Sequence, residues 1–491
     1  MYERLRGLFH HSAAYTLGSL LNRAFAFIII PIYTRALTQQ DYGAYVLLNA
    51  GAAVLTVVYE LGISSAVTRY YYEFDDDAAR RRYIGTAWVT LTGITAALTA
   101  LLLVFGAGIS QPLFRGISFW PYVVLMIATT FLSTAAYIPY VLMRVREQST
   151  RFVVVIVAQA VILTVLVIVL VVVLHLGLLG AVLALFGESV AVFVFFTAYT
   201  LRNASLRFEW SWAKRSLVYG APVMLLLGGW WVLDAADRFI LRHFTTARVV
   251  AIYSVGYAIG RILVLVSQSA NQALTPFFFS LVKEGDPETD RILSYTATYF
   301  TLAVAGLGLL IVVFAREAVL FFGGYAYLEA AKVTPLIVVA AVIQGMFYVP
   351  SRGLFLKSKT AYLPPLVAAG AGVNIALNFW LIPAYGMIGA AVATIAGYVV
   401  TVALTYVVSQ RSYRIHYQTA RMAKLLGVFC VVTALSMAVQ PHAWYLLVLS
   451  KFALLAAAPA LLFLLGFFER QELAAVRRMA RRPRFAGGSA L

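Results

Sequence analysis

Three charged residues fall within five consecutive positions of a largely apolar stretch of this chain, GGWWVLDAADRFILRHF. They are Asp234, Asp237 and Arg238. Asp234 and Arg238 are four residues apart on a helix, with the acid first, which is the favourable arrangement for an ion pair on one helix face. Asp237 points elsewhere and has no base of its own except through the long reach of Arg238. The spacing therefore predicts a structural pair and one further carboxylate that is free to bind a ligand.

The chain around these residues is that of an integral membrane protein. It has 491 residues, of which 62% are hydrophobic and 12% are charged, whereas soluble proteins carry about 25% charged residues. Its mean hydropathy is +0.86. The single cysteine, Cys430, excludes a disulfide framework or a cysteine-based metal cluster within one chain.

Fourteen apolar stretches are each near the ~20 residues that cross a bilayer as a helix. The first is too long for the core of a signal peptide, so we expect it to be a retained span. The sequence thus predicts an all-α polytopic membrane protein. The predicted spans are 12–34, 43–68, 84–108, 120–143, 152–174, 177–200, 216–240, 249–272, 292–314, 331–351, 361–383, 386–408, 424–440 and 443–467.

Basic residues collect in alternate connections, which explains the net charge of +18. By the positive-inside rule, this alternation places both termini in the cytoplasm and requires an even number of spans. The surplus charge is then a topology signal that also contacts anionic lipid headgroups, and we expect no nucleic-acid partner. The basic connections include Arg69, Arg80–Arg82, Arg144–Arg151, Arg202–Arg215, Arg352–Lys359 and Arg411–Lys424.

The two halves of the chain resemble each other at a shift of roughly 210 residues. LGLLGAVLA (176–184) at the start of span six recurs as YGMIGAAVA (385–393) at the start of span twelve, and YIPY (137–140) recurs as YVPS (348–351). Six spans per unit make a parallel repeat, with the functional site between the halves. We therefore expect an N-terminal lobe at 1–210, a C-terminal lobe at 211–415, two further spans at 416–468 and a basic cytoplasmic tail at 469–491.

No GxxxxGK[ST] loop occurs, so energy for any transport comes from an ion gradient or from the substrate's own gradient.

Several motifs together resemble a known family. They are LTQQDYGAYVL (37–47), ELGISSAVTRYYYEF (60–74), DRFIL (237–241) and NIALNFWLIPAYGMIGAAVAT (374–394). This ordered set is similar to the polysaccharide transporters, or Wzx-type oligosaccharide flippases, of the multidrug/oligosaccharidyl-lipid/polysaccharide exporter superfamily. The resemblance implies two six-helix lobes in a V shape. It also implies movement of a polyprenyl-diphosphate-linked oligosaccharide from the cytoplasmic to the outer leaflet of the bacterial inner membrane, for O-antigen or exopolysaccharide-type synthesis.

Charged residues inside spans are costly and usually face a cavity or the bundle interior. A diphosphate that leaves water needs cationic partners with several donors, and arginine supplies them in a planar fork. We expect Arg23 and Arg261 to bind this headgroup, with Glu60, Glu188 and Arg69 as further candidates for the substrate site. The alternative is that Arg23 pairs with Glu60, and Arg261 with Glu188 or an aspartate, while Arg69 anchors the cytoplasmic side.

Four polar residues are expected at one depth near the outer ends of their spans: Asp237, Asn374, Asn378 and Thr394. Carboxylate, amide and hydroxyl oxygens are the ligands that a small hard cation prefers. The resemblance implies a Na⁺ site at these positions, although lipid-II-type relatives carry an acid where this chain has Asn378. Asp234 is a further candidate ligand. The alternative is that the asparagines hydrogen-bond between helices, at ~0.6 kcal/mol each.

The leading interpretation is a flippase and not an enzyme, with no cofactor other than a coupling Na⁺ or H⁺. Its expected partners are membrane lipids, the lipid-linked glycan, a glycan polymerase and glycosyltransferases. One alternative is a cation-coupled exporter of small amphipathic compounds, which would favour buried carboxylates over arginines. Another is a membrane-embedded glycan polymerase, ligase or acyltransferase, which would place catalytic His, Asp or Arg residues in large outer loops.

Overall fold

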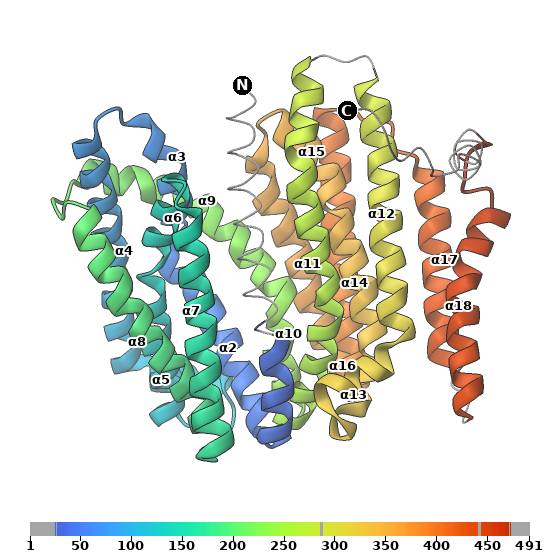
Figure 1. Ribbon diagram of the computed structural model, residues 1–491, viewed down its shortest axis with the longest axis horizontal. Coiled ribbons are helices and arrows are strands. Elements are labelled where there is room, and N and C mark those ends of the chain that lie inside the picture. Colours follow the sequence, from blue (N-terminus) through green and yellow to red (C-terminus); the bar gives the residue numbers. More distant parts are fainter. Residues whose placement is uncertain (1–24, 26, 285–287, 440–442, 471, 473–491) are drawn as a thin grey trace, which may run out of the picture. The chain divides into compact units, whose positions relative to one another are not determined.

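The computed structural model describes residues 25, 27–284, 288–439, 443–470 and 472. All regular elements among these residues are helices (Figure 1). Twelve of the helices in this part of the chain are long and apolar enough to cross a membrane. The predicted fold class, an all-α polytopic membrane protein, is therefore confirmed. Most of the first predicted span lies outside the described residues, which contain only a short apolar helix, 27–36.

One of the twelve, α16 (Leu363–Ser412), is a hairpin of two span-length arms. The chain reverses at Gly386, which has φ +54° and ψ −130°, just after Pro383. Gly370 lies against Thr401, and a Cβ added at Gly397 would meet the Cβ of Asn374 at 2.9 Å, so the arms run antiparallel. These arms correspond to the predicted spans 361–383 and 386–408. The total of fourteen spans stays a prediction, because the first lies mostly outside the described part.

The first half of the chain forms a bundle in which α5 contacts α2, α4 and α8. The predicted span 43–68 is broken into α2 and α3, because Leu61 and Gly62 both adopt positive φ, 47° and 68°. The helices of this half are α2 (Gln39–Glu60), α3 (Ile63–Tyr70), α4 (Asp77–Leu113), α5 (Val124–Thr134), α6 (Tyr137–Val145), α7 (Ser149–Val167) and α8 (Gly177–Asn203).

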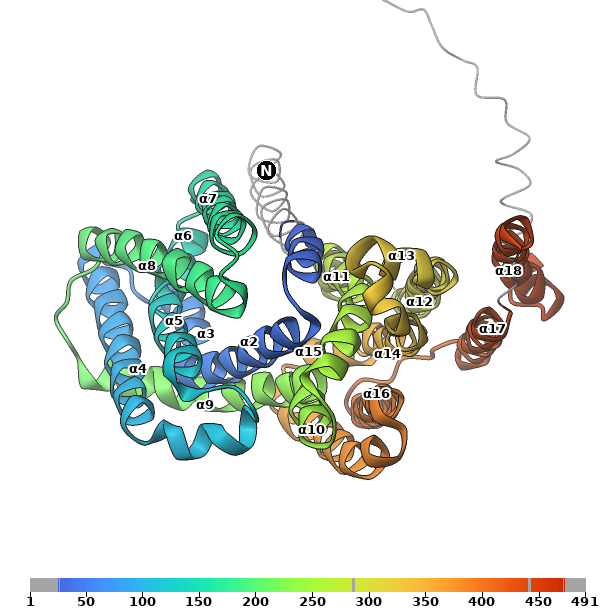
Figure 2. The same cartoon turned by 90° about the horizontal axis from the view of Figure 1, so that it is seen from below.

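The seventh predicted span links the two halves. Its first part, α9, contacts α2, α3 and α4 of the first half and also α16, and α10 packs mainly on α16. Figure 2 shows this path, with α9 beside α4 and α10 beside α16. The remaining helices of the second half are α9 (Trp210–Trp231), α10 (Asp237–Phe244), α11 (Ala247–Glu284), α12 (Thr289–Val313), α13 (Ala315–Gly323), α14 (Thr334–Met346), α15 (Tyr348–Leu356) and α16.

The contact between α3 and α9 depends on two glycines that face each other. A Cβ added at Gly62 would lie 2.7 Å from the Cα of Gly220, and one added at Gly220 would lie 2.9 Å from the carbonyl carbon of Gly62. These separations are shorter than any packed carbon pair, so the two backbones touch directly. The absence of side chains here lets the halves approach at this crossing.

The chain forms two compact units. One contains 1–262 and 316–414, and the other contains 263–315 and 415–491, within the limits of the described residues. In the second unit α12 packs on α17 (Thr419–Ala438) and α18 (Trp444–Leu464). The second unit thus groups α12 with the two last helices, and the expected segments 1–210, 211–415, 416–468 and 469–491 stay a prediction.

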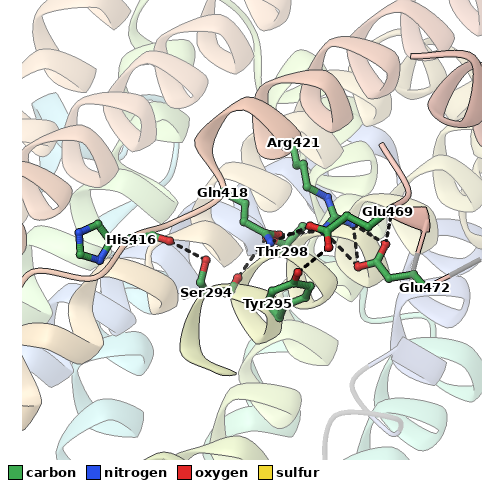
Figure 3. A network of polar contacts seen from close by, with 8 residues as sticks. All are labelled: Ser294, Tyr295, Thr298, His416, Gln418, Arg421, Glu469 and Glu472. Carbon is green, nitrogen blue, oxygen red and sulfur yellow. Dashed lines mark hydrogen bonds and ion pairs between the residues drawn. The ribbon is translucent and has the colours of Figure 1, made fainter. Parts of the chain in front are cut away.

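In the second unit, a cluster of polar side chains joins α12, the start of α17 and the C-terminal segment (Figure 3). The guanidinium of Arg421, in the first turn of α17, pairs with Glu469 at 3.1 Å and with Glu472 at 3.0 Å. It also lies 4.7 Å from the ring centroid of Phe467, and Tyr295 of α12 donates a hydrogen bond to Glu469 at 2.6 Å. This cluster, called the Arg421 clasp below, holds the described start of the predicted basic tail by its acidic residues.

The Arg421 clasp is expected to open in acid. Burial works to raise the pKa of Glu472, but hydrogen bonds from Tyr299, the backbone of Glu469 and Arg421 outweigh it, so the pKa lies below its usual value. A carboxyl with a lowered folded-state pKa stabilises the fold fully above its unfolded pKa of about 4.3, and this stabilisation is lost as the pH falls through the folded-state pKa. Hydrogen exchange of 467–470 should therefore accelerate below about pH 4, after correction for intrinsic rates.

In Glu472→Gln the same segment should exchange faster already at pH 7, whereas the exposed Asp75→Asn should behave as wild type. Equal corrected exchange of the wild type at pH 3.5 and 7 would contradict the clasp.

Adding one methyl group at the glycine crossing should destabilise the protein. Gly220→Ala forces a Cβ into the backbone of Gly62 and should cost about 1–3 kcal/mol, as overpacking does. Gly228→Ala, on the same helix, meets nothing within 4 Å and should be neutral or gain up to about 1 kcal/mol. Thermal unfolding of the purified variants in detergent measures the difference; equal midpoints for the two would refute the role of the crossing.

Candidate functional site

A π-helical turn interrupts the seventh span at its charged residues. The turn Val232–Ala236 lies between α9 and α10 and contains Asp234, while Asp237 begins α10. A π turn inserts extra backbone into the helix, so side chains beyond it are rotated from their regular α-helical positions. The partners of Asp234 and Asp237 therefore differ from those that regular spacing predicts.

The predicted ion pair between Asp234 and Arg238 is wrong. Arg238 Nη1 donates instead to the backbone carbonyl of Asp234 at 2.6 Å and to Oδ1 of Asp237 at 3.0 Å. The backbone oxygen is available because a π turn leaves carbonyl groups without their usual helical partners. Asp237, for which the sequence offered no base except Arg238 by its long reach, is thus the carboxylate that pairs with Arg238.

The side chain of Asp237 is completely buried and hydrogen-bonded. Its side chain has no exposed surface, and its Oδ2 accepts a hydrogen bond from Tyr253 and a long one, 3.5 Å, from Thr394. The guanidinium of Arg238 lies 4.2 Å from the ring centroid of Tyr257. This pair satisfies the requirement that charges buried away from water be compensated by hydrogen bonds and an opposite charge.

The two asparagines of the first arm of α16 form a second buried layer. Asn378 Nδ2 donates to Asn374 Oδ1 at 3.0 Å, and both side chains are fully buried. Asn374 Nδ2 and Asn378 Oδ1 have no hydrogen-bond partner among the described residues. A buried carbonyl oxygen without a donor is available to a cation, whereas Arg238 already neutralises Asp237.

Asp234 pairs with Arg261 of α11. Its Oδ1 also accepts hydrogen bonds from Tyr398, at 2.5 Å, and from Tyr257, at 3.4 Å. The side chains of Asp234 and Arg261 remain 26% and 29% exposed, so this pair is more accessible than the Asp237–Arg238 pair. Of the two alternatives for Arg261, the structure shows pairing with an aspartate and not with Glu188.

The other candidates lie in the first half of the chain, apart from these two ion pairs. Glu60 is buried at the end of α2 and accepts a hydrogen bond from Ser64. Arg69 stacks on Tyr219, 5.5 Å from its ring centroid, and Glu188 of α8 interacts with Gln159 of α7. Arg23 lies outside the described residues.

Three tyrosines of the site escaped the sequence analysis. Tyr253 and Tyr257 precede Arg261 at intervals of four residues on α11, and Tyr398 follows Thr394 by four on α16. These intervals place each set on one helix face. A search for hydroxyl groups in register with the intramembrane charges would have found them.

Comparison with known proteins identifies the family of this chain. A family model described as "Polysaccharide biosynthesis protein" matches residues 8–282, more than half of the chain. An uncharacterized membrane protein of Methanocaldococcus jannaschii is 27% identical over 185 residues, which cover 37% of this chain and 36% of that protein. The chain thus spans about a third of the length of this curated relative.

Solved structures share the fold over most of their length. The lipid II flippase MurJ in an inward closed conformation matches 91% of this chain and 98% of its own, with 13% identity and a TM-score of 0.72. An inward-facing multidrug resistance transporter of the MATE family matches 80% and 94%, with 16% identity and a TM-score of 0.64. A Pyrococcus furiosus transporter of the multidrug/oligosaccharidyl-lipid/polysaccharide (MOP) exporter superfamily matches 82% of this chain and 95% of its own, with 15% identity and a TM-score of 0.56.

The two ion pairs should differ in their contribution to stability. Asp237→Asn leaves the guanidinium of Arg238, whose side chain is 11% exposed, without its acid, and breaking a buried pair costs about 3–5 kcal/mol. Asp234→Asn leaves the more accessible Arg261 and should cost less. Unfolding of the two variants in detergent measures the order. Asp237→Asn as stable as wild type would show that the Asp237–Arg238 pair is not a charged one.

Proposed function

Because the chain belongs to the polysaccharide biosynthesis protein family, we infer that it moves a polyprenyl-diphosphate-linked oligosaccharide across the bilayer. The fold it shares with the MurJ and MATE structures supports a transporter and offers no support for an enzyme. In this proposal the basic ends of the spans face the cytoplasm of a bacterium, and the glycan passes from the cytoplasmic to the outer leaflet of the inner membrane. Glycosyltransferases and a glycan polymerase act before and after it.

The observation that carries the proposal is that Arg261 is partly exposed and pairs with a single described carboxylate. Arg261 lies inside a membrane span, its side chain is 29% exposed, and among the described residues it pairs with one carboxylate, that of Asp234. An arginine has five N–H donors, so a single carboxylate leaves donors for a further anion. A diphosphate accepts such donors bidentately.

Exchange of partners is the mechanism that this geometry supports. Without substrate, Asp234 neutralises Arg261 and accepts hydrogen bonds from Tyr398 and Tyr257. When a diphosphate contacts Arg261, it takes over part of this neutralisation, and Asp234 keeps the two tyrosines as donors. The cost of bringing the headgroup out of water is thereby reduced, because its charge meets a cation already fixed in place.

Coupling to a cation is a separate part of the proposal. Asp237, Asn374, Asn378 and Thr394 lie on α10 and the two arms of α16, and Asn378 Oδ1 has no donor among the described residues. Na⁺ bound between these groups would weaken the ion pair of Asp237 with Arg238. Because Arg238 also donates to the backbone carbonyl of Asp234, this change would affect the neighbouring Asp234–Arg261 pair. H⁺ on Asp237 would have the same consequence.

Transport by proteoliposomes tests the role of Arg261. With a fluorescent polyprenyl-diphosphate oligosaccharide, Arg261→Gln should lower the initial rate of translocation roughly thirtyfold or more, since removing one partner of a buried charge-assisted contact costs ~2–5 kcal/mol. Arg261→Lys, which keeps the charge and loses the planar fork, should fall between wild type and Arg261→Gln.

The matched control is Arg248→Gln, an exposed residue in the first turn of the same helix, which should transport as wild type. Replacement of Na⁺ by choline in the same assay tests coupling. A full rate in Arg261→Gln would overturn the headgroup proposal, and a full rate in choline at constant pH would leave no role for Na⁺.

A further inference from the structure

A groove between α7 and α8 lies outside the candidate site described above. It is lined by residues of α6, α7 and α8, which lie side by side in Figure 1, and encloses about 620 Å³. Its walls are the stretch 150–162 of α7 and the stretch 191–203 of α8, and Met143 near the end of α6 also lines it. These residues define the α7–α8 groove.

Polar and apolar residues are segregated along the α7–α8 groove. The polar ones gather at its mouth, at the start of α7 and the end of α8: Thr150, Arg151, Tyr199, Arg202 and Asn203. The deeper walls are almost entirely apolar: Val154, Val155, Ala158, Ile162, Ala191, Val192, Phe195 and Phe196. A groove with a cationic mouth and apolar walls matches an amphipathic anion, with its charge at the surface and its chain inside the membrane.

The depth of the groove is that of one leaflet. From Arg151 to Ile162 on α7, and from Arg202 back to Ala191 on α8, the helix rises roughly 16 Å at ~1.5 Å per residue. This is about half of the ~30 Å hydrocarbon core of a bilayer. An acyl chain that starts at the arginines would reach the bilayer centre at the closed end of the groove.

The arginines at the mouth are free for a ligand. Neither Arg151 nor Arg202 forms an ion pair with a carboxylate in the part of the chain that the structure describes. A third guanidinium, that of Arg146, is held beside them by Asn203 Oδ1 at 2.7 Å. The acid nearest in sequence, Glu147, is exposed and makes no ion pair with these arginines.

The polar residue deeper in the groove needs no ligand. Gln159 Oε1 accepts a hydrogen bond from Tyr140 of α6, and its amide interacts with Glu188 of α8. Since these groups satisfy one another, the lower part of the groove is suited to a hydrocarbon chain and not to a second headgroup.

From this geometry we propose that the α7–α8 groove binds one anionic glycerophospholipid of the leaflet at the basic end. Its phosphate lies on Arg151 and Arg202, and one acyl chain lies along the apolar walls. Basic pockets between membrane helices are suited to such headgroups, because guanidinium groups contact phosphate oxygens in pairs. The bound lipid ties the start of α7 to the end of α8, where the two helices have no turn to connect them.

Lipid titration of the purified chain in a neutral detergent tests the site. Phosphatidylglycerol should bind, by native mass spectrometry and by an increase in thermal stability, while phosphatidylcholine with the same chains and inorganic phosphate should not. Arg151→Gln with Arg202→Gln should weaken phosphatidylglycerol binding roughly thirtyfold, as two basic contacts near a headgroup contribute ~1 kcal/mol each.

The matched control removes two charges elsewhere at the same membrane end. Arg411→Gln with Arg414→Gln, at exposed positions, should bind phosphatidylglycerol as wild type does. A second pair, Ala158→Phe with Ala191→Phe, keeps the arginines and fills the apolar walls, and it should lose binding if a chain occupies the groove.

Phosphatidylglycerol binding that is unchanged in the arginine pair or in the phenylalanine pair would overturn the proposal, and so would equal binding of phosphatidylcholine. Displacement of phosphatidylglycerol from the groove by a polyprenyl phosphate at lower concentration would also overturn it, since the groove would then serve the transported lipid.

Discussion

The central constraint on this molecule is the need to compensate the charges that it places inside the membrane at the seventh and eighth spans. A carboxylate or guanidinium in a low-dielectric interior is tolerated only with an opposite charge and hydrogen bonds around it. Two acids and two bases meet this requirement at the seventh and eighth spans, as Asp237–Arg238 and Asp234–Arg261. The π turn at Val232–Ala236 makes the arrangement possible, because it turns the two aspartates toward different partners.

The hairpin α16 joins these ion pairs to the rest of the second half. Thr394 contacts Asp237 and Tyr398 contacts Asp234, both from its second arm, while the buried asparagines lie on its first arm. A ligand that changes the charge balance at one pair therefore acts on the helix that also contacts the other. In the proposed transport cycle this connection lets an anionic headgroup at Arg261 and a cation near Asp237 influence each other through shared helices.

Backbone contact and charge have separate roles at the basic ends of the spans. The crossing of Gly62 and Gly220 brings α3 and α9 together without side chains, so its geometry tolerates no added atom. Arginines near helix ends serve two purposes in this chain. Arg421 pairs with the acids of the C-terminal segment, whereas Arg151 and Arg202 form no ion pair with a described carboxylate and line an apolar groove. The difference lies in their neighbours.

The sequence by itself determined that the chain is an all-helical membrane protein, because spans of about twenty apolar residues admit no other structure in lipid. It also located the charged residues of the site, since any charge in such a span is conspicuous, and it predicted the two arms of α16 as the spans 361–383 and 386–408. Only the tertiary structure decided which charge pairs with which. Sequence spacing assumes a regular helix, so it joined Asp234 to Arg238 and left Asp237 free. The π turn alters that spacing locally, and Arg261, Tyr253 and Tyr398 come from other helices at separations that no local pattern encodes.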